Sequence, residues 1–295
     1  MALAQHQRPL EIEEYVGASS LAEALQAVAD GKGTLVAGAT DLWIQKDLDA
    51  RQFGRRLVNI KRVRELTGIG ERGTAIRVGA LATVSEIRES ALLQRAAPVL
   101  PAAADRFGSP QIRNAATLGG NIANASPAAD MVIPLLCLDA EVEVASWHGD
   151  VATRRVPLQA MFRGPGRTCL GPNELIMAVW IDRPAPDFHA VFVKSGPRPA
   201  LEIARVSMCL AARREGGRLL GVRLAYGAVA PTPLRCIATE GVLEGVVLDD
   251  EAIALALASV ECEISPIDDV RASAWYRRHL ARTYLEQELR RVAQG

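Results

Sequence analysis

The stretch IRNAATLGGNIANASPAADMVIPLLCLD, residues 112–139, carries the strongest signal in this chain for both fold and function. Its first part is dense in small, hydrogen-bonding residues, and its second part is an apolar run. A glycine pair lets a ligand approach the backbone N–H groups closely because no Cβ intervenes. Hydroxyl and amide side chains beside it add hydrogen bonds. The stretch therefore predicts a cradle suited to a phosphate or diphosphate, followed by a helix that anchors it to the core. For Gly-Gly-Asn alone, a surface turn with a helix start is the alternative. The polar positions are Thr117, Gly119, Gly120, Asn121, Asn124 and Ser126.

A second stretch of the same kind lies about 80 positions earlier. Residues 34–37 predict a short buried strand, which runs directly into the small residues Gly38, Ala39 and Thr40 and then Asp41. This is a second candidate phosphate loop. An ordinary strand-to-helix turn with Asp41 as the N-cap is the alternative.

Composition excludes several classes of protein. The 295 residues carry no formal net charge, so we expect no general affinity for nucleic acid or anionic membranes. No apolar run approaches the roughly 20 residues that span a bilayer, and the N-terminus lacks the pattern of a signal peptide. We therefore expect a cytoplasmic protein. The five cysteines are scattered and the four histidines show no ligand spacing, so we expect reduced thiols and no metal or iron–sulfur ligation by this chain.

The pattern along the chain predicts alternating α and β elements. Before the central stretch we expect a helix over 19–31 with a Ser20–Glu23 capping box, a strand over 56–60 and a hairpin over 69–79. We then expect a second capping box at Thr83 and Glu86 and helices over 91–107. After it we expect a hairpin over 141–156 and a strand over 174–181. Pro184 and Pro186 indicate a domain boundary. Beyond it we expect a meander over 190–228 and helices over 251–262 and 273–292, which together form an α+β layer domain.

The two small-residue loops lack the Gly-x-Gly-x-x-Gly spacing of a Rossmann unit. Together they resemble the two diphosphate-binding loops of the flavin subunit of molybdenum hydroxylases, the family of the xanthine dehydrogenase and carbon monoxide dehydrogenase medium subunits. The resemblance covers nearly the whole chain and is most specific over residues 112–122. Further motifs occur in family order: ASPxxD at 125–130, GRTxLxP at 166–172, Arg205-Val and DVRASAxYR at 269–277.

This resemblance implies an α+β fold. It consists of a two-lobed FAD-binding domain of the vanillyl-alcohol-oxidase/PCMH type over residues 1–183, with the lobes split near residues 55–60. A small C-terminal α+β domain of the carbon monoxide dehydrogenase flavoprotein type follows over residues 187–295. FAD would lie between the lobes. One departure is Ala39, where the family often has a second glycine. Alanine tolerates a positive φ less well than glycine, so we expect that loop to be kept with a slightly altered backbone.

The resemblance also assigns residues to FAD. The backbone N–H groups of Gly119 and Gly120 would face the diphosphate. Asp130 would lie along the ribityl and adenosine portion, or be the N-cap of the next helix. Phe107 and Leu170 would pack near the flavin ring, or only in the core. Lys194 would place a positive charge at the reactive edge of the flavin, or be a solvated lysine at a strand end. The full set is Ala37, Gly38, Ala39, Thr40, Asp41, Phe107, Ala116, Thr117, Gly119, Gly120, Asn121, Asn124, Ser126, Asp130, Leu170 and Lys194.

The implied activity is that of an oxidoreductase subunit for which FAD supplies the redox chemistry. No side chains form a set that we assign to catalysis. By resemblance, a large subunit with a molybdopterin cofactor oxidises the substrate. A small subunit carries two [2Fe-2S] clusters, and electrons reach FAD in this chain before leaving to NAD+, oxygen or a quinone. We expect a heterotrimer or a dimer of heterotrimers. A stand-alone flavoprotein reductase or oxidase and a non-catalytic assembly subunit are the alternatives.

Overall fold

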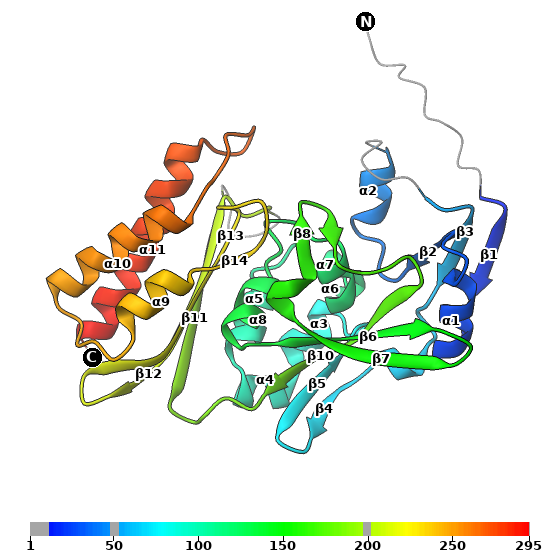
Figure 1. The fold of residues 1–295 in the computed structure, drawn as a ribbon, viewed down its shortest axis with the longest axis horizontal. Helices are drawn as coiled ribbons and strands as arrows, with labels where there is room; N and C mark the ends of the chain where they lie inside the picture. The colour runs from blue at the N-terminus through cyan, green and yellow to red at the C-terminus, as the bar shows by residue number, and fades with distance from the viewer. Residues whose placement is uncertain (1–11, 48–52, 197–201, 295) are drawn as a thin grey trace, which may run out of the picture.

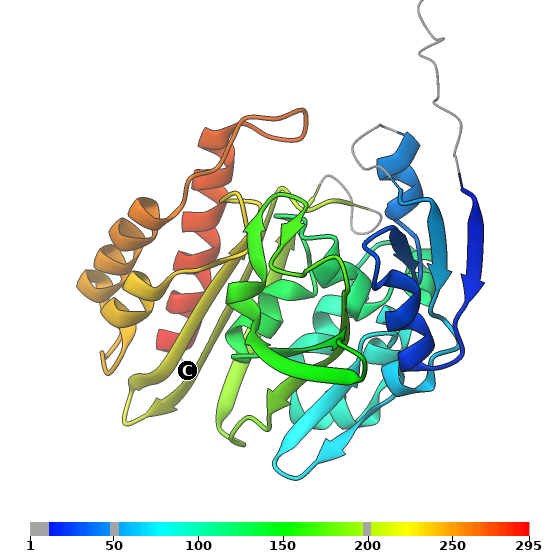
Figure 2. The same cartoon turned by 45° about the vertical axis from the view of Figure 1, so that its right-hand side comes forward.

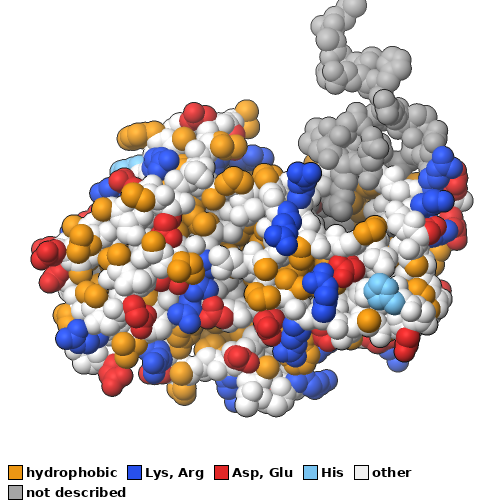
Figure 3. All heavy atoms as spheres, in the orientation of Figure 1, with side chains coloured by type: hydrophobic (Ala, Val, Ile, Leu, Met, Phe, Trp, Pro, Cys, Tyr) orange, Lys and Arg blue, Asp and Glu red, His pale blue; other side chains and the backbone are white. Residues whose placement is uncertain are grey.

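Three sheets follow one another along the chain, each accompanied by helices, in a computed structural model that describes residues 12–47, 53–196 and 202–294 (Figure 1). The three sheets lie side by side in chain order, and the C-terminal helices cover the far side of the third sheet (Figures 1 and 2). The observed fold is the expected α+β class. Charged side chains of both signs are interspersed over the face seen in Figure 3, in keeping with the formal net charge of zero.

The first sheet is a small parallel sheet with strand order β1-β3-β2. Parallel neighbours need crossover connections, and α1 provides the first. Ser20 caps α1 as predicted, because its side chain accepts a hydrogen bond from the N–H of Glu23 at 3.2 Å. The second bond of the predicted capping box is wrong, because the Glu23 carboxylate accepts from the N–H of Ser19 and not from that of Ser20. The elements are β1 (Glu14–Gly17), α1 (Leu21–Val28), β2 (Gly33–Val36), α2 (Leu42–Asp47) and β3 (Arg56–Asn59).

The second sheet is antiparallel, with strand order β4-β5-β10-β6-β7. Both predicted hairpins are present in it. Because β3 still pairs in the first sheet, the change from one sheet to the next falls between Asn59 and Ile69. The strands are β4 (Ile69–Arg72), β5 (Ala75–Gly79), β6 (Glu141–Trp147), β7 (Val151–Pro157) and β10 (Glu174–Asp182), with a separate hairpin of β8 (Phe162–Gly164) and β9 (Arg167–Thr168) and short 3-10 turns at Arg64–Leu66 and Leu158–Met161.

Six short helices occupy the space between the second and third sheets. The capping box predicted at Thr83 and Glu86 is formed at the start of α3. The apolar run after Asp130 is α8, and every residue of this helix is buried. It anchors the central stretch in the largest hydrophobic cluster of the protein, as expected. The helices are α3 (Val84–Glu89), α4 (Ala91–Ala96), α5 (Val99–Asp105), α6 (Pro110–Ala115), α7 (Leu118–Ala123) and α8 (Val132–Cys137).

The third sheet, with strand order β11-β12-β13-β14, is antiparallel and packs on both faces. Side chains alternate along a strand. Met208 and Leu210 face the C-terminal helices, whereas the alternate residues Cys209 and Ala211 join the cluster that contains α8. The elements are β11 (Phe188–Ser195), β12 (Val206–Glu215), β13 (Arg218–Gly227), β14 (Leu234–Arg235), α9 (Ile237–Leu243), α10 (Asp250–Glu263) and α11 (Ala274–Gln294).

All five cysteines are free thiols. Burial raises the pKa of the Cys137 thiol well above its usual range, so this side chain stays protonated and packs as a small apolar group. In the described part of the chain, no helix combines the length and apolarity needed to cross a membrane.

Candidate cofactor-binding site

The two candidate phosphate loops, far apart in the sequence, meet in the structure. Gly38 follows β2 and lies directly against the backbone between α6 and α7. A Cβ placed on Gly38 would come within 1.9 Å of the carbonyl oxygen of Ala115. Only glycine permits this approach, which explains the glycine after the strand. The interpretation of residues 38–41 as an ordinary strand-to-helix turn does not account for such close packing between two loops.

Ala39 adopts the left-handed backbone conformation that glycine prefers, with a φ of 56°. The substitution therefore leaves the local path of a glycine loop in place, at a cost of about 1 kcal/mol for a non-glycine residue. Within the described residues, the N–H groups of Gly38, Ala39 and Thr40 donate no hydrogen bond. Consecutive unpaired N–H groups in a loop that contains a left-handed residue form an anion-binding concavity. The first loop is thus the better source of backbone donors.

Two backbone donors of the second loop, the N–H groups of Gly119 and Gly120, already bond to protein acceptors, which corrects the expectation that they face the diphosphate. The N–H of Gly119 donates to the carbonyl oxygen of Ala80 at 2.8 Å, and that of Gly120 donates to the Oγ1 of Thr117 at 3.1 Å. Thr117 is the N-cap of α7. A Cβ on Gly119 would lie 2.7 Å from the Cβ of Ala80. Gly119 therefore allows close packing on the strand end, and its N–H does not face a ligand.

Gln45, on α2, connects the two loops through its side chain. Its Nε2 donates to Oδ2 of Asp41 and to Oδ1 of Asn124, each at 2.6 Å. Sequence reasoning missed this residue. The available signal was its spacing, since positions i and i+4 of a helix share one face and Gln45 lies four residues after Asp41.

Asp130 and Lys194 form a buried ion pair, with Lys194 Nζ 2.5 Å from Asp130 Oδ2 and side-chain exposures of 5% and 9% for Lys194 and Asp130. For each residue, the alternative to a role in FAD binding is therefore wrong. Lys194 is not a solvated lysine at a strand end, and the N-cap of α8 is Met131. Lys194 also donates to the carbonyl oxygens of Arg106 and Glu202. Burial raises the pKa of Asp130 to about 6, against the opposing effect of Lys194.

Two buried acceptors of the site have no partner among the described residues. They are Oδ1 of Asn121 and Oδ1 of Asp130. Buried polar atoms are nearly always hydrogen-bonded, and each exception indicates a strained site or a missing ligand. FAD carries hydroxyl donors on its ribityl chain and ribose and negative charge on its diphosphate. The free N–H groups of the first loop and these two acceptors therefore match FAD in kind.

Comparison with known proteins identifies the family of the chain. Residues 10–184 match the family model described as the FAD binding domain in molybdopterin dehydrogenase. Residues 191–292 match the CO dehydrogenase flavoprotein C-terminal domain. The chain belongs to the FAD-binding medium subunits of molybdenum hydroxylases. Members of this family are subunits of oxidoreductases, and FAD is the cofactor of their first domain.

Individual relatives of this flavin subunit match it over nearly its full length. The xanthine dehydrogenase FAD-binding subunit of Escherichia coli O157:H7 is 34% identical over 278 residues, which cover 92% of this chain and 93% of that protein. The glyceraldehyde dehydrogenase medium chain of Sulfolobus acidocaldarius is 30% identical over 280 residues, covering 95% and 98% of the two chains. A solved carbon monoxide dehydrogenase from Hydrogenophaga pseudoflava gives a TM-score of 0.88 at 28% identity, covering 93% and 94% of the two chains.

The other expected cofactor residues of the flavin subunit lie around the same loops. Ala125, between the expected residues Asn124 and Ser126, has a φ of 47° and accepts a hydrogen bond from the N–H of Gly166 in the β8–β9 turn. The Oγ of Ser126 accepts from the N–H of Ala128. Phe107 and Leu170 are half-buried at the edge of the cluster that contains α8, and Leu170 follows β9. Ala37 is half-buried against the core of the first lobe, and Ala116 is buried between α6 and α7.

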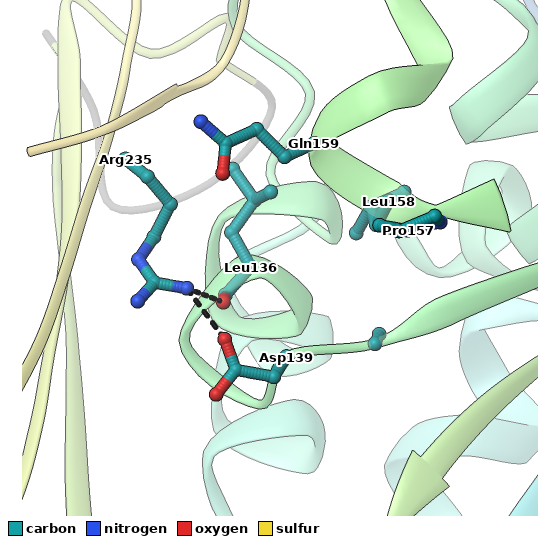
Figure 4. A pocket seen from close by; sticks show the side chains of 7 residues that line it. Leu136, Asp139, Pro157, Leu158, Gln159 and Arg235 are labelled. Carbon is teal, nitrogen blue, oxygen red and sulfur yellow. Dashed lines mark hydrogen bonds and ion pairs between the residues drawn. The ribbon is translucent and has the colours of Figure 1, made fainter. Parts of the chain in front are cut away.

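A separate cavity of about 110 Å³ lies at the opposite end of α8 from Asp130 (Figure 4). Arg235 reaches into it from the third sheet and donates to the carbonyl oxygen of Leu136 and to Asp139. Its remaining guanidinium bonds go to Glu240. The charge of Arg235 is therefore already compensated, and this cavity forms no part of the flavin cradle.

Proposed function

We propose that this chain is the FAD-carrying electron-transfer subunit of a cytoplasmic molybdenum hydroxylase. It would accept electrons from the [2Fe-2S] clusters of a small partner subunit and deliver them to an external acceptor such as NAD+, oxygen or a quinone. A large partner subunit with a molybdopterin cofactor would oxidise the substrate. The assembly would be a heterotrimer or a dimer of heterotrimers.

The observation that carries this proposal is the contact of the two loops at Gly38 and Ala115, where N–H groups of the first loop have no acceptor among the described residues. The family matches over residues 10–184 and 191–292 support the same proposal. The medium chain of a carbon monoxide dehydrogenase from Afipia carboxidovorans, 30% identical over 236 residues, supports the assignment to a multisubunit enzyme.

The residues of the chain have distinct roles in holding FAD. The N–H groups of Gly38, Ala39 and Thr40 would donate to the diphosphate, and Asn121 and Asp130 would accept from its hydroxyl groups. Gln45 would keep the two loops together. FAD, when bound, supplies the redox chemistry. The buried charge of Lys194, held by Asp130, would favour negative charge nearby, because burial lowers the effective dielectric constant.

A flavin measurement on the purified chain tests the cofactor assignment. We expect flavin absorption peaks without an iron–sulfur shoulder and one FAD per chain. Gly38→Ala should remove most of the flavin, because its Cβ would collide with the carbonyl oxygen of Ala115. Gly70→Ala is the matched control, since the nearest atom to its Cβ is 3.9 Å away. Absence of flavin after gentle purification with the partners would overturn the assignment.

Affinity purification tests the proposed assembly. A tagged copy should bring down two untagged subunits, one with iron–sulfur absorption and one with molybdenum. Stopped-flow reoxidation of the reduced complex with NAD+, oxygen and a quinone then identifies the acceptor. Efficient turnover of a small substrate by the isolated chain would instead indicate a stand-alone flavoprotein.

A further inference from the structure

The motif at residues 269–277 contributes no residue to the cradle described above, yet it forms an ordered, charged structure. Oδ1 of Asp269 accepts from the N–H groups of Arg271 and Ala272 and from Nη2 of Arg277, at 2.8, 3.0 and 2.8 Å. Although burial alone would raise the pKa of Asp269, these bonds and the Arg277 charge hold it at about 2. The carboxylate is therefore ionised near neutral pH and fixes the guanidinium of Arg277.

Arg277 uses its other terminal nitrogen on two backbone carbonyl groups. Nη1 donates to the carbonyl oxygen of Arg205 at 2.6 Å and to that of Ala228 at 3.0 Å. The Arg277 side chain is only 4% exposed. A planar guanidinium with several fixed donors can join three acceptors in this way, whereas a lysine ammonium lacks that geometry.

The turn at Ala228 connects Arg277 to the cradle. Ala228 has a φ of 62°, a conformation that a non-glycine residue keeps only when its surroundings enforce it. Its carbonyl is held by Arg277, and its N–H donates to the carbonyl oxygen of Pro127 at 2.8 Å. This single residue, directly after β13, therefore connects the C-terminal motif to the segment between Ser126 and Asp130.

The segment is held at a second point by the same sheet. Asp130, three residues after Pro127, pairs with Lys194 on β11. The N–H of Ala228 and the ammonium of Lys194 thus fix the two ends of residues 127–130. A shift of the Ala228 turn would act on the backbone that positions Asn124 and Asp130, whose Oδ1 has no partner among the described residues.

We propose that Asp269 and Arg277 are positioning residues for FAD: they hold the Ala228 turn against Pro127 and thereby set the geometry of the 124–130 segment. This inference rests on the proposed function of that segment in FAD binding. Neither side chain touches the cradle, so both act through the backbone of Ala228.

FAD titration of the full-length, flavin-depleted chain tests the inference. Arg277→Lys keeps the charge but loses the multiple fixed donors, so we expect the Kd for FAD to rise about tenfold, the effect of losing roughly one good hydrogen bond. Asp269→Asn should give a smaller rise. Adding Ala228→Gly to Arg277→Lys should restore part of the affinity, because glycine adopts the turn without enforcement. Glycine also relieves strain at this left-handed position, so the rescue supports positioning only where the Kd recovers by more than the thermal stabilisation that Ala228→Gly gives alone.

Arg235→Lys is the matched control. Arg235 is also a buried, multiply bonded arginine between the third sheet and α8, but it binds the far end of that helix. We expect the Kd of Arg235→Lys for FAD to stay within about twofold of wild type, even if this variant is thermally destabilised as much as Arg277→Lys. An unchanged Kd in Arg277→Lys, or an equal rise in Arg235→Lys, overturns the inference.

Hydrogen exchange of the wild-type chain keeps the inference testable if both variants fail to fold. FAD should protect the amides of residues 124–130 and also those of residues 226–229 and 269–272. Protection of the first segment alone overturns the positioning role and leaves the proposed function intact. If wild type binds no FAD in the titration, the proposed function itself fails.

Discussion

Three alanines with left-handed backbones surround the candidate cradle: Ala39, Ala125 and Ala228, with φ angles of 56°, 47° and 62°. Each costs about 1 kcal/mol relative to a relaxed backbone. Backbone strain concentrates where the surrounding structure fixes a ligand site. At the scale of single residues, the site is thus built on backbone conformations that side chains and close contacts impose.

Ala39→Gly should relieve this strain. We expect the free energy of unfolding to rise by about 0.5 kcal/mol, because relief of the left-handed strain exceeds the entropic cost of a glycine, and the Kd for FAD to fall or stay unchanged. Thermal unfolding and FAD titration measure the two effects. Ala37→Gly, at a position without a positive φ, should instead destabilise the chain. Equal losses in both variants would contradict the strain argument.

Asp130 gives the flavin-free chain a distinctive pH dependence. Its pKa is about 6 in the folded chain, against an ordinary value of 3.8. The folded state therefore binds a proton that the unfolded state releases between about pH 4 and pH 6, and stability from this group rises as the pH falls through that window.

Asp130→Asn removes this proton uptake. We compare the free energies of unfolding of wild type and variant. The wild-type value minus the variant value should increase by about 2 kcal/mol as the pH falls from 7.5 to 4.5. Chemical unfolding at several pH values measures the difference, and titrating groups that do not contact Asp130 cancel in it. A difference that is constant or falls with decreasing pH would refute the assignment.

At the scale of elements, Gln45 on α2 joins the start of its own helix to the end of α7, because its side chain donates to Asp41 just before α2 and to Asn124, the C-cap of α7. Gln45→Ala should weaken FAD binding about tenfold, by freeing the first loop from the second. Gln45→Glu should be worse, because it has the same shape but loses both donor bonds and places a charge beside Asp41. FAD titration ranks the variants, and a glutamate variant that binds as well as wild type would exclude the link.

Local patterns predicted the elements well, because capping boxes and period-2 alternation act over a few residues. Thr83 and Glu86 form the expected box, and α8 follows Asp130 as expected. The bonds of the site were harder to predict, because their partners are distant in the sequence. The N–H of Gly119 meets Ala80, and Asp130 meets Lys194 across 64 positions. No local pattern specifies such contacts.

At the scale of the whole molecule, the third sheet belongs to two cores. Ala225 on β13 packs toward α8, while its neighbours Leu224 and Tyr226 pack under the C-terminal helices. The small side chains on the α8 side allow the helix to approach the sheet closely. The proposed division into residues 1–183 and 187–295 therefore cuts through a shared hydrophobic contact as well as the bonds at Pro127 and Asp130.

Splitting the chain between residues 184 and 187 should therefore give two pieces that depend on each other. Expressed alone, residues 1–184 would expose α8, and residues 187–295 would expose one face of the sheet; large exposed apolar patches promote aggregation. We expect each piece alone to be insoluble or to lack a cooperative unfolding transition, and the co-expressed pieces to purify together. The complex should retain FAD, because the contacts of Lys194 and Ala228 re-form across the cut. Size-exclusion chromatography and flavin absorption measure the outcome, with the intact chain as the control. A monomeric first piece that unfolds cooperatively and binds FAD as tightly as the intact chain would show that the third sheet is dispensable for the cradle.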